Sequence, residues 1–164
     1  MEGPPLVERL RLPGKDLFAQ IEQFLLEGRQ VCLIVTGTSM WPLIRHGHDA
    51  VRLAALHRPP RRGDLLLLKS PEPHNRYILH RVHKVSADAV ITLGDSRVQP
   101  DPPVPLNCVI GRVEAVIRNG REYSCDGPLL RAYAWLWALA LPVRRPLLRL
   151  LLAAGKALRK LGLR

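Results

Sequence analysis

The sequence predicts a mainly β (α+β) fold, with a β body that follows one N-terminal helix and precedes basic amphipathic helices. Three observations support this prediction. The 164 residues suffice for one domain and an appendage. Fifteen prolines and 12 glycines favour short strands joined by stiff turns. An apolar fraction of 47% is enough to build a core, which excludes a mainly disordered chain.

The order of the elements follows from periodicity and turn residues. Apolar residues recur every three or four positions over residues 15–28, which predicts an amphipathic helix ending at Gly28. The pair Asn119-Gly120 predicts a tight hairpin turn. Strand-like segments separated by turn residues lie at 30–36, 49–56, 64–69, 76–85, 89–93, 108–118 and 122–124.

The composition changes abruptly at residue 129. Residues 129–141 form an apolar block about 13 residues long, whereas a membrane-spanning helix needs roughly 20. A second apolar block lies at 147–152, and the two are separated by a proline-containing break at 142–146. Two short helices of this kind can lie on a bilayer or form a shallow hairpin, and Trp135 and Trp137 suit the interfacial zone. The alternative is a helical cap packed on the body.

We therefore expect three regions: an N-terminal helical segment at 1–28, a β domain at 29–128 and a basic, apolar helical tail at 129–164. The formal net charge is +11, and the tail supplies +8 of it because it holds eight basic residues and no acidic residue. Its basic residues alternate with Leu, Trp and Ala, a pattern that favours an anionic phospholipid surface over nucleic acid. We expect no nucleic-acid partner.

The cysteines and the N-terminus bear on the compartment. The chain has three cysteines, an odd number, and they are widely spaced at Cys32, Cys108 and Cys125. We therefore expect reduced thiols in a cytosolic chain rather than a disulfide framework. Residues 1–13 contain no apolar run of signal-peptide length. Export by that route is not expected.

A serine lies in a glycine-containing turn directly after an apolar strand, within Thr36-Gly37-Thr38-Ser39-Met40-Trp41-Pro42. Glycine allows close backbone approach to a substrate, and Ser39 can present its hydroxyl and its own amide to one carbonyl. Taken alone, most such serines merely satisfy a turn.

A histidine occupies a position where apolar residues are expected. Strand alternation over 76–85 places Ile78, His80 and Val82 on one face. It places Leu79, Arg81 and His83 on the other face. A lone histidine on such a face is usually a core or edge residue. A general base also suits this environment, because a strand fixes its position and partial desolvation keeps it neutral near pH 7.

Two aspartates follow within one short stretch. Asp95 lies in a Gly-Asp turn, where an aspartate commonly caps its own loop. Asp101 lies between Pro100 and Pro102, so its backbone is stiff and extended. A carboxylate held in this way can hydrogen-bond an imidazole and fix its tautomer.

Taken together and in this order, these segments resemble the conserved boxes of the type I signal peptidase superfamily, in its histidine-bearing branch typified by the endoplasmic-reticulum and archaeal enzymes. The resemblance covers roughly residues 30–118. Its boxes are Gly37-Thr38-Ser39-Met40-Trp41-Pro42, Gly47-His48-Asp49, Gly63-Asp64, His80-Arg81-Val82, and Gly94-Asp95 with Asp101.

The resemblance implies a serine endopeptidase that needs no metal or other cofactor. By position, Ser39 is the nucleophile, His80 the general base, Asp101 the orienting carboxylate and Asp95 a supporting acid. His46 and His48 lack a third metal ligand nearby, so we interpret them as solvent-facing loop residues.

The sequence also departs from the family pattern. Family members usually carry a serine or threonine oxyanion donor at the position of Gly37. Either Thr38 substitutes for it, or the backbone amide of Ser39 acts with less help. Ser96 replaces the frequent asparagine after the Gly-Asp pair, and the N-terminal membrane anchor of true signal peptidases is not recognisable.

We therefore expect a signal-peptidase-like endopeptidase that processes a precursor or leader peptide on the cytoplasmic side of a membrane. The tail would hold it there peripherally or by shallow insertion. If the tail packs on the body, we expect a cytoplasmic protein. The alternative function is a catalytically silent adaptor of the same fold, bound to membrane or nucleic acid.

Overall fold

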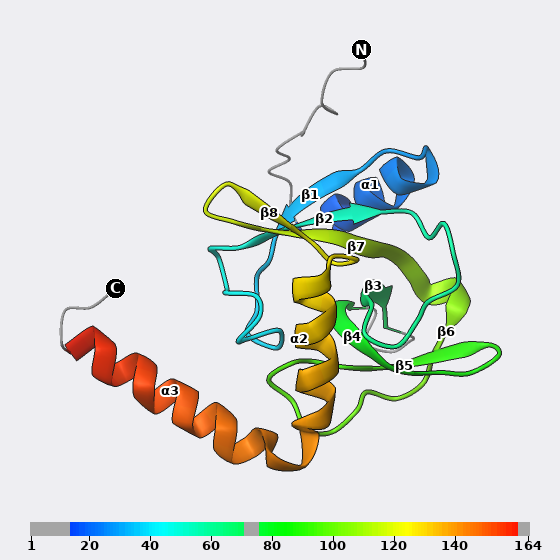
Figure 1. Ribbon diagram of the computed structural model, residues 1–164. Helices are drawn as coiled ribbons and strands as arrows, with labels where there is room; N and C mark the ends of the chain where they lie inside the picture. Colours follow the sequence, from blue (N-terminus) through cyan, green and yellow to red (C-terminus); the bar gives the residue numbers. More distant parts are fainter. Residues whose placement is uncertain (1–13, 71–75, 161–164) are drawn as a thin grey trace.

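The computed structural model describes residues 14–70 and 76–160. Eight strands form one curled antiparallel sheet in the order β1-β2-β7-β3-β4-β5-β6, with β8 paired to β7 (Figure 1). A curled antiparallel sheet with three helices among the described residues confirms the mainly β, α+β prediction. The strands are β1 (Val31–Ile34), β2 (Ala50–Ala54), β3 (Leu65–Lys69), β4 (Tyr77–Val85), β5 (Ala89–Leu93), β6 (Val104–Pro105), β7 (Val109–Arg118) and β8 (Arg121–Ser124).

The helices and the hairpin turn agree with the sequence pattern. The helices are α1 (Gly14–Leu26), α2 (Pro128–Leu139) and α3 (Arg144–Lys160), with single 3-10 turns at η1 (Leu106–Cys108) and η2 (Leu141–Val143). Asn119 and Gly120 have φ values of 51° and 75°, the positive values that a type I′ turn requires between β7 and β8. Strand β6 was not predicted, because its two residues lie among prolines and show no alternation.

The two faces of the sheet carry different cores. One face holds α1 and a cluster that includes Leu65 and Leu67. The other holds a smaller cluster built around Leu66 and Leu68. His80 pairs in register with Leu66, and Arg81 pairs with Leu65. Since cross-strand partners share a face, the predicted alternation of β4 is confirmed and His80 lies over the smaller cluster.

Helix α2 packs on the body, as the alternative interpretation of the tail expected. Trp137 is buried, and its indole Nε1 donates a hydrogen bond to the Asp95 carbonyl oxygen at 3.0 Å. Trp137 is therefore committed to the fold and does not face a membrane interface, whereas Trp135 is 65% exposed. The break in the tail falls at 140–143 rather than 142–146, because Pro146 is accommodated in the first turn of α3.

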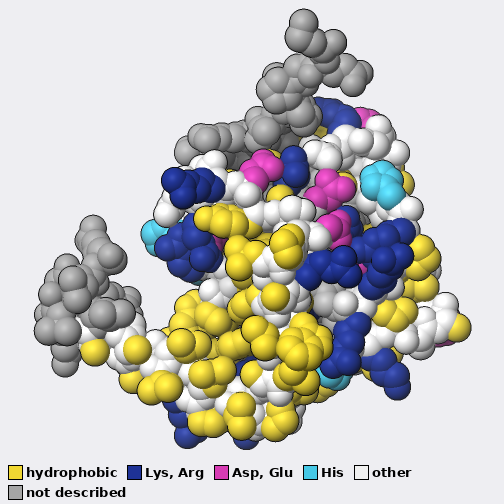
Figure 2. All heavy atoms as spheres, viewed as in Figure 1, with side chains coloured by type: hydrophobic (Ala, Val, Ile, Leu, Met, Phe, Trp, Pro, Cys, Tyr) yellow, Lys and Arg dark blue, Asp and Glu magenta, His cyan; other side chains and the backbone are white. Residues whose placement is uncertain are grey.

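Helix α3 extends away from the sheet (Figure 1). Apolar side chains on α2 and α3 form a broad surface on one side of the molecule, which we call the apolar tail surface (Figure 2). In the described residues of the tail, its exposed members are Leu129, Trp135, Leu136, Leu139, Val143, Leu150, Leu151 and Leu152. No helix of the described residues combines the length and apolarity needed to cross a bilayer.

A buried carboxylate ties the loop after β1 to the sheet. Asp49 is 0% exposed and accepts hydrogen bonds from the guanidinium groups of Arg45 and Arg118 and from the Arg45 amide. Burial alone would raise the pKa of Asp49, but these hydrogen bonds hold it well below its ordinary value. Arg118 also donates to the carbonyl oxygen of Leu43, so β7 holds the loop that carries Ser39.

We predict that Asp49→Ala lowers the free energy of unfolding by about 2–3 kcal/mol near neutral pH, because it removes a charged, buried hydrogen-bond acceptor. The folded-state pKa of Asp49 is depressed, so its contribution is complete above its unfolded-state pKa of about 3.9 and is lost as the pH falls. Urea denaturation at several pH values measures this. Asp88→Ala, at an exposed aspartate, is the control. A deficit for Asp49→Ala that is equally large at pH 3 would contradict the account.

Candidate active site

The imidazole of His80 is joined to the carboxylate of Asp101. His80 lies in β4 and is 3% exposed, and its Nδ1 lies 2.5 Å from Asp101 Oδ2. Asp101 comes from the segment between β5 and β6, and its amide donates to the Thr92 carbonyl oxygen at 2.8 Å. The extended backbone expected between two prolines therefore runs beside β5 and directs the carboxylate at the ring.

A second donor fixes the same carboxylate oxygen. The Thr92 hydroxyl donates to Asp101 Oδ2 at 2.7 Å. Burial by itself would raise the pKa of Asp101, but the hydrogen bonds from His80 and Thr92 and the nearby charges hold it below its ordinary value. The carboxylate stays ionised and acts only as an acceptor, so Nδ1 of His80 carries a proton and Nε2 is left as the basic atom.

Gly94 brings Ser39 against the imidazole. A Cβ built on Gly94 would lie 3.0 Å from His80 Nε2 and 3.2 Å from Ser39 Cβ, so both atoms border the same point. That Cβ would also lie 2.7 Å from the Ser39 carbonyl oxygen, closer than real Cβ atoms come to backbone. Glycine at this position is what allows the serine and the basic nitrogen to approach each other. In the described residues, no hydrogen bond yet joins the Ser39 hydroxyl to His80.

Ser96 holds the turn that carries Ser39 in place from the same loop as Gly94. Its amide and its hydroxyl both donate to the Ser39 carbonyl oxygen, at 2.9 Å and 3.1 Å. On the other side of the turn, the Gly37 amide donates to His46 Nδ1 at 2.7 Å, and Gly37 has a φ of 113°, which favours glycine. Gly37 is therefore needed for the shape of the turn in this chain.

The two predicted oxyanion donors lie at the open side of the turn. The Ser39 amide donates to no acceptor within the described residues, so it remains free to bind a substrate oxygen. Thr38 is exposed beside it, and its hydroxyl makes no hydrogen bond to described residues. The two alternatives for the oxyanion site, the Ser39 amide alone or together with Thr38, both stay as predictions.

Asp95 lies apart from this group. Its carboxylate accepts two hydrogen bonds from Arg81, at 2.9 Å and 2.8 Å, and one from the Tyr133 hydroxyl at 3.3 Å. Arg81 points to the opposite face of β4 from His80. The structure thus brings Ser39, His80 and Asp101 together and places Asp95 in the ion pair that anchors α2.

Three supporting residues were not recognised from the sequence. Thr92, Ser96 and His46 act through hydrogen bonds to residues distant in sequence or across a loop. Ser96 was noted only as a replacement for asparagine, and the sequence carries no local signal for the others. His46 and His48 are exposed in their loop, as expected. Among residues 14–70 and 76–160, no group of three or more His, Cys, Asp or Glu is arranged to hold a metal ion.

The arrangement can support nucleophilic acyl transfer. It supplies a hydroxyl, a basic nitrogen, a buried carboxylate that orients the ring and a free amide beside the hydroxyl. No protein-family model matches the chain, and no curated protein matches it. The assignment of a function therefore depends on the geometry and on the resemblance of the motifs.

We predict that Gly94→Ala displaces the Ser39 carbonyl and breaks its hydrogen bonds with Ser96. Hydrogen exchange followed by NMR should show the Ser96 amide exchanging about five- to tenfold faster, as expected for the loss of about 1 kcal/mol. Gly155→Ala is the control, because a Cβ there meets nothing within 4 Å. Unchanged protection of the Ser96 amide in Gly94→Ala would show that this close approach does not position the serine.

Proposed function

We propose that this protein is a serine endopeptidase with Ser39 as nucleophile, His80 as general base and Asp101 as the carboxylate that orients the base. The observation that carries the proposal is that His80 Nδ1 binds Asp101 at 2.5 Å while Nε2 borders Ser39 at Gly94. An acyl-transfer enzyme requires this polarity of the ring, with the proton toward the carboxylate and the lone pair toward the hydroxyl.

In the proposed reaction, His80 Nε2 takes the hydroxyl proton of Ser39 as its oxygen attacks the carbonyl carbon of the scissile bond. The Ser39 amide, with or without the Thr38 hydroxyl, stabilises the oxyanion. The protonated imidazole then donates its proton to the leaving amine, and the acyl-enzyme forms. Water, activated by His80, hydrolyses the ester and regenerates the Ser39 hydroxyl.

The proposed substrate is a precursor or leader peptide. This part of the proposal rests on the resemblance to the type I signal peptidase superfamily, whose box order is matched over roughly residues 30–118. Asp95 keeps only an indirect supporting role in the proposal. Its carboxylate accepts hydrogen bonds from Arg81 and from Tyr133 of α2, and it does not contact Ser39 or His80 through a hydrogen bond among the described residues.

The proposed place of action is a membrane surface on its cytoplasmic side. The apolar tail surface supplies contact area, and the tail supplies eight basic residues without an acidic one. Anionic head groups attract such a segment while its apolar side chains enter the interface. Helix α3 is suited to this role because it extends from the body and leaves Leu150 66% exposed.

We predict that Ser39→Ala lowers kcat for peptide hydrolysis about 10⁴- to 10⁶-fold, because the covalent route is lost. Ser86→Ala, at an exposed serine of the β4–β5 turn, should retain full activity. Hydrolysis of a short soluble peptide measures kcat. Comparing new protein N-termini in cells that carry each variant shows whether natural substrates are processed. Equal processing by Ser39→Ala and by the unmodified protein would support the adaptor alternative.

We predict that Leu150→Asp weakens binding to phosphatidylglycerol vesicles about tenfold or more. The variant loses an apolar side chain that would enter the membrane, and it gains a negative charge that the anionic head groups repel. Val85→Asp, at a partly exposed valine of β4, introduces the same charge away from the tail. Sedimentation with vesicles measures the affinity, and hydrolysis of a short soluble peptide should be equal in both variants. Equal binding of the two variants would remove α3 from the proposed contact.

A further inference from the structure

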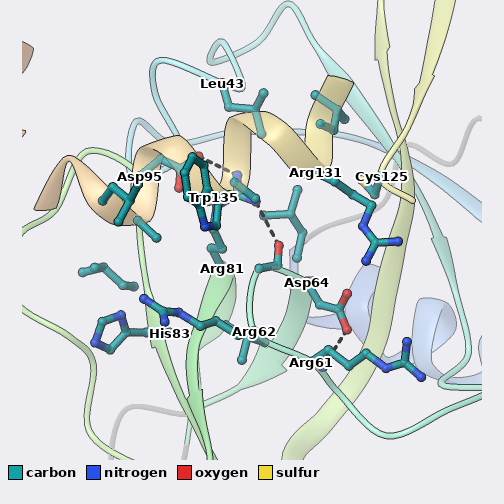
Figure 3. Close-up of a pocket in the computed structure, with 18 of the residues that line it drawn as sticks. Leu43, Arg61, Arg62, Asp64, Arg81, His83, Asp95, Cys125, Arg131 and Trp135 are labelled. Atoms are coloured by element: carbon teal, nitrogen blue, oxygen red, sulfur yellow. Dashed lines mark hydrogen bonds and ion pairs between the residues drawn. The ribbon is translucent and has the colours of Figure 1, made fainter. Parts of the chain in front are cut away.

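A cavity of about 580 Å³ lies on the face of the sheet opposite His80, between α2 and the segment that leads into β3 (Figure 3). One wall is apolar and comes from the tail, through Ala134, Trp135, Ala138 and Leu141. The proposed peptidase mechanism uses none of these residues. The cavity also borders Arg81 and Asp95, which have only an anchoring role in the proposed peptidase, and its lining does not include Ser39, His80 or Asp101.

A buried guanidinium lines this cavity and lacks a carboxylate of its own. Arg144 is 2% exposed and donates to two neutral acceptors, the carbonyl oxygens of Arg97 at 2.9 Å and Trp137 at 2.7 Å. Its Nε is buried without any hydrogen-bond partner among the described residues. Both oxygens of the nearby Asp95 carboxylate already accept hydrogen bonds from Arg81. The cluster thus buries two guanidinium groups against one carboxylate, which is costly without a further anion.

Further positive charge surrounds the same cavity. Figure 3 shows the Arg62 side chain extending toward His83, and burial together with Arg62 and Arg144 lowers the pKa of His83. Arg61, Arg62 and Arg131 form no ion pair with a carboxylate of the described residues. By contrast, the guanidinium groups of Arg58 and Arg112 each form an ion pair with an aspartate, at 2.7 Å and 2.8 Å. These two arginines therefore need no anion from outside the chain.

We propose that this cavity binds an anionic amphiphile, with its phosphate or carboxylate at Arg144 and Arg62 and its hydrocarbon chain against Ala134, Ala138 and Leu141. Guanidinium groups bind such anions through charge-assisted hydrogen bonds, and the apolar wall accepts the chain. The lining also includes Trp135 and Leu139, which are exposed and belong to the apolar tail surface. A phospholipid of the membrane and a free acyl amphiphile share this chemistry. The inference does not depend on the proposed peptidase.

Other occupants fit the cavity less well. A second copy of this chain would bring a second tail with eight basic residues and no acidic residue, which the arginines would repel. A nucleic acid offers phosphates but has no hydrocarbon chain for the apolar wall. The combination of buried cation and apolar lining selects a ligand that carries both an anion and a chain.

The test measures the affinity of the full chain for monomeric dodecyl phosphate by calorimetry. We expect saturable binding, weakened about tenfold or more in Arg62→Gln, because a charge-assisted hydrogen bond is lost. Arg62 is exposed, so the variant should fold. Ala138→Trp, which fills the cavity without changing charge, should weaken binding at least as much. Arg121→Gln removes the same charge from the β7–β8 hairpin and should bind like the unmodified protein.

Two further arms separate the sources and the classes of ligand. Competition by phosphatidylglycerol vesicles would identify a membrane lipid as the source, and its absence would identify a free amphiphile; both outcomes support the site. Inorganic phosphate binding as tightly as dodecyl phosphate would overturn the proposal, as would equal affinities of Arg62→Gln, Ala138→Trp and Arg121→Gln. Binding of dodecyl phosphate and hydrolysis of a short soluble peptide are separate measurements, so failure of this site and failure of the peptidase proposal are distinguishable.

Discussion

The hydrogen bond between His80 and Asp101 is the interaction on which the site depends, and the strand that provides it also anchors the tail. His80 and Arg81 are neighbours in β4 and point to opposite faces. On one face the imidazole meets Asp101, and on the other the guanidinium meets Asp95 and, through Tyr133, helix α2. The alternation of β4 therefore places the candidate catalytic pair on one face of the sheet and the ion pair that anchors α2 on the other face.

Local patterns were sufficient for much of the fold and for part of the site. Alternation placed His80 on the face of the apolar residues, and the flanking prolines indicated the extended backbone at Asp101. The close approach at Gly94 and the carbonyl contacts of Ser96 could not be predicted, because they join segments more than 50 residues apart in sequence. The burial of Trp137 was also missed, since its partner is a backbone carbonyl far along the chain.

The tail shows how one segment can serve packing and surface contact together. Helix α2 contributes Tyr133 and Trp137 to the body, where their polar atoms find partners at Asp95. The same helix leaves Trp135 and Leu139 exposed. Apolar side chains cover one side of both α2 and α3 (Figure 2). Large exposed apolar patches often mark interaction surfaces in proteins, and this is the basis for the membrane contact that we propose. In our proposal, the basic charge of the tail is what favours an anionic partner for this surface.

Reaction of the folded protein with a fluorophosphonate, followed by location of the adduct by mass spectrometry, shows whether His80 activates Ser39. The reagent forms a stable bond with serines that a neighbouring base deprotonates. We expect a single adduct on Ser39, formed about 100-fold or more slowly in His80→Ala, in keeping with the size of general-base effects. An adduct on another serine, or labelling of Ser39 at the same rate without the imidazole, would contradict the account.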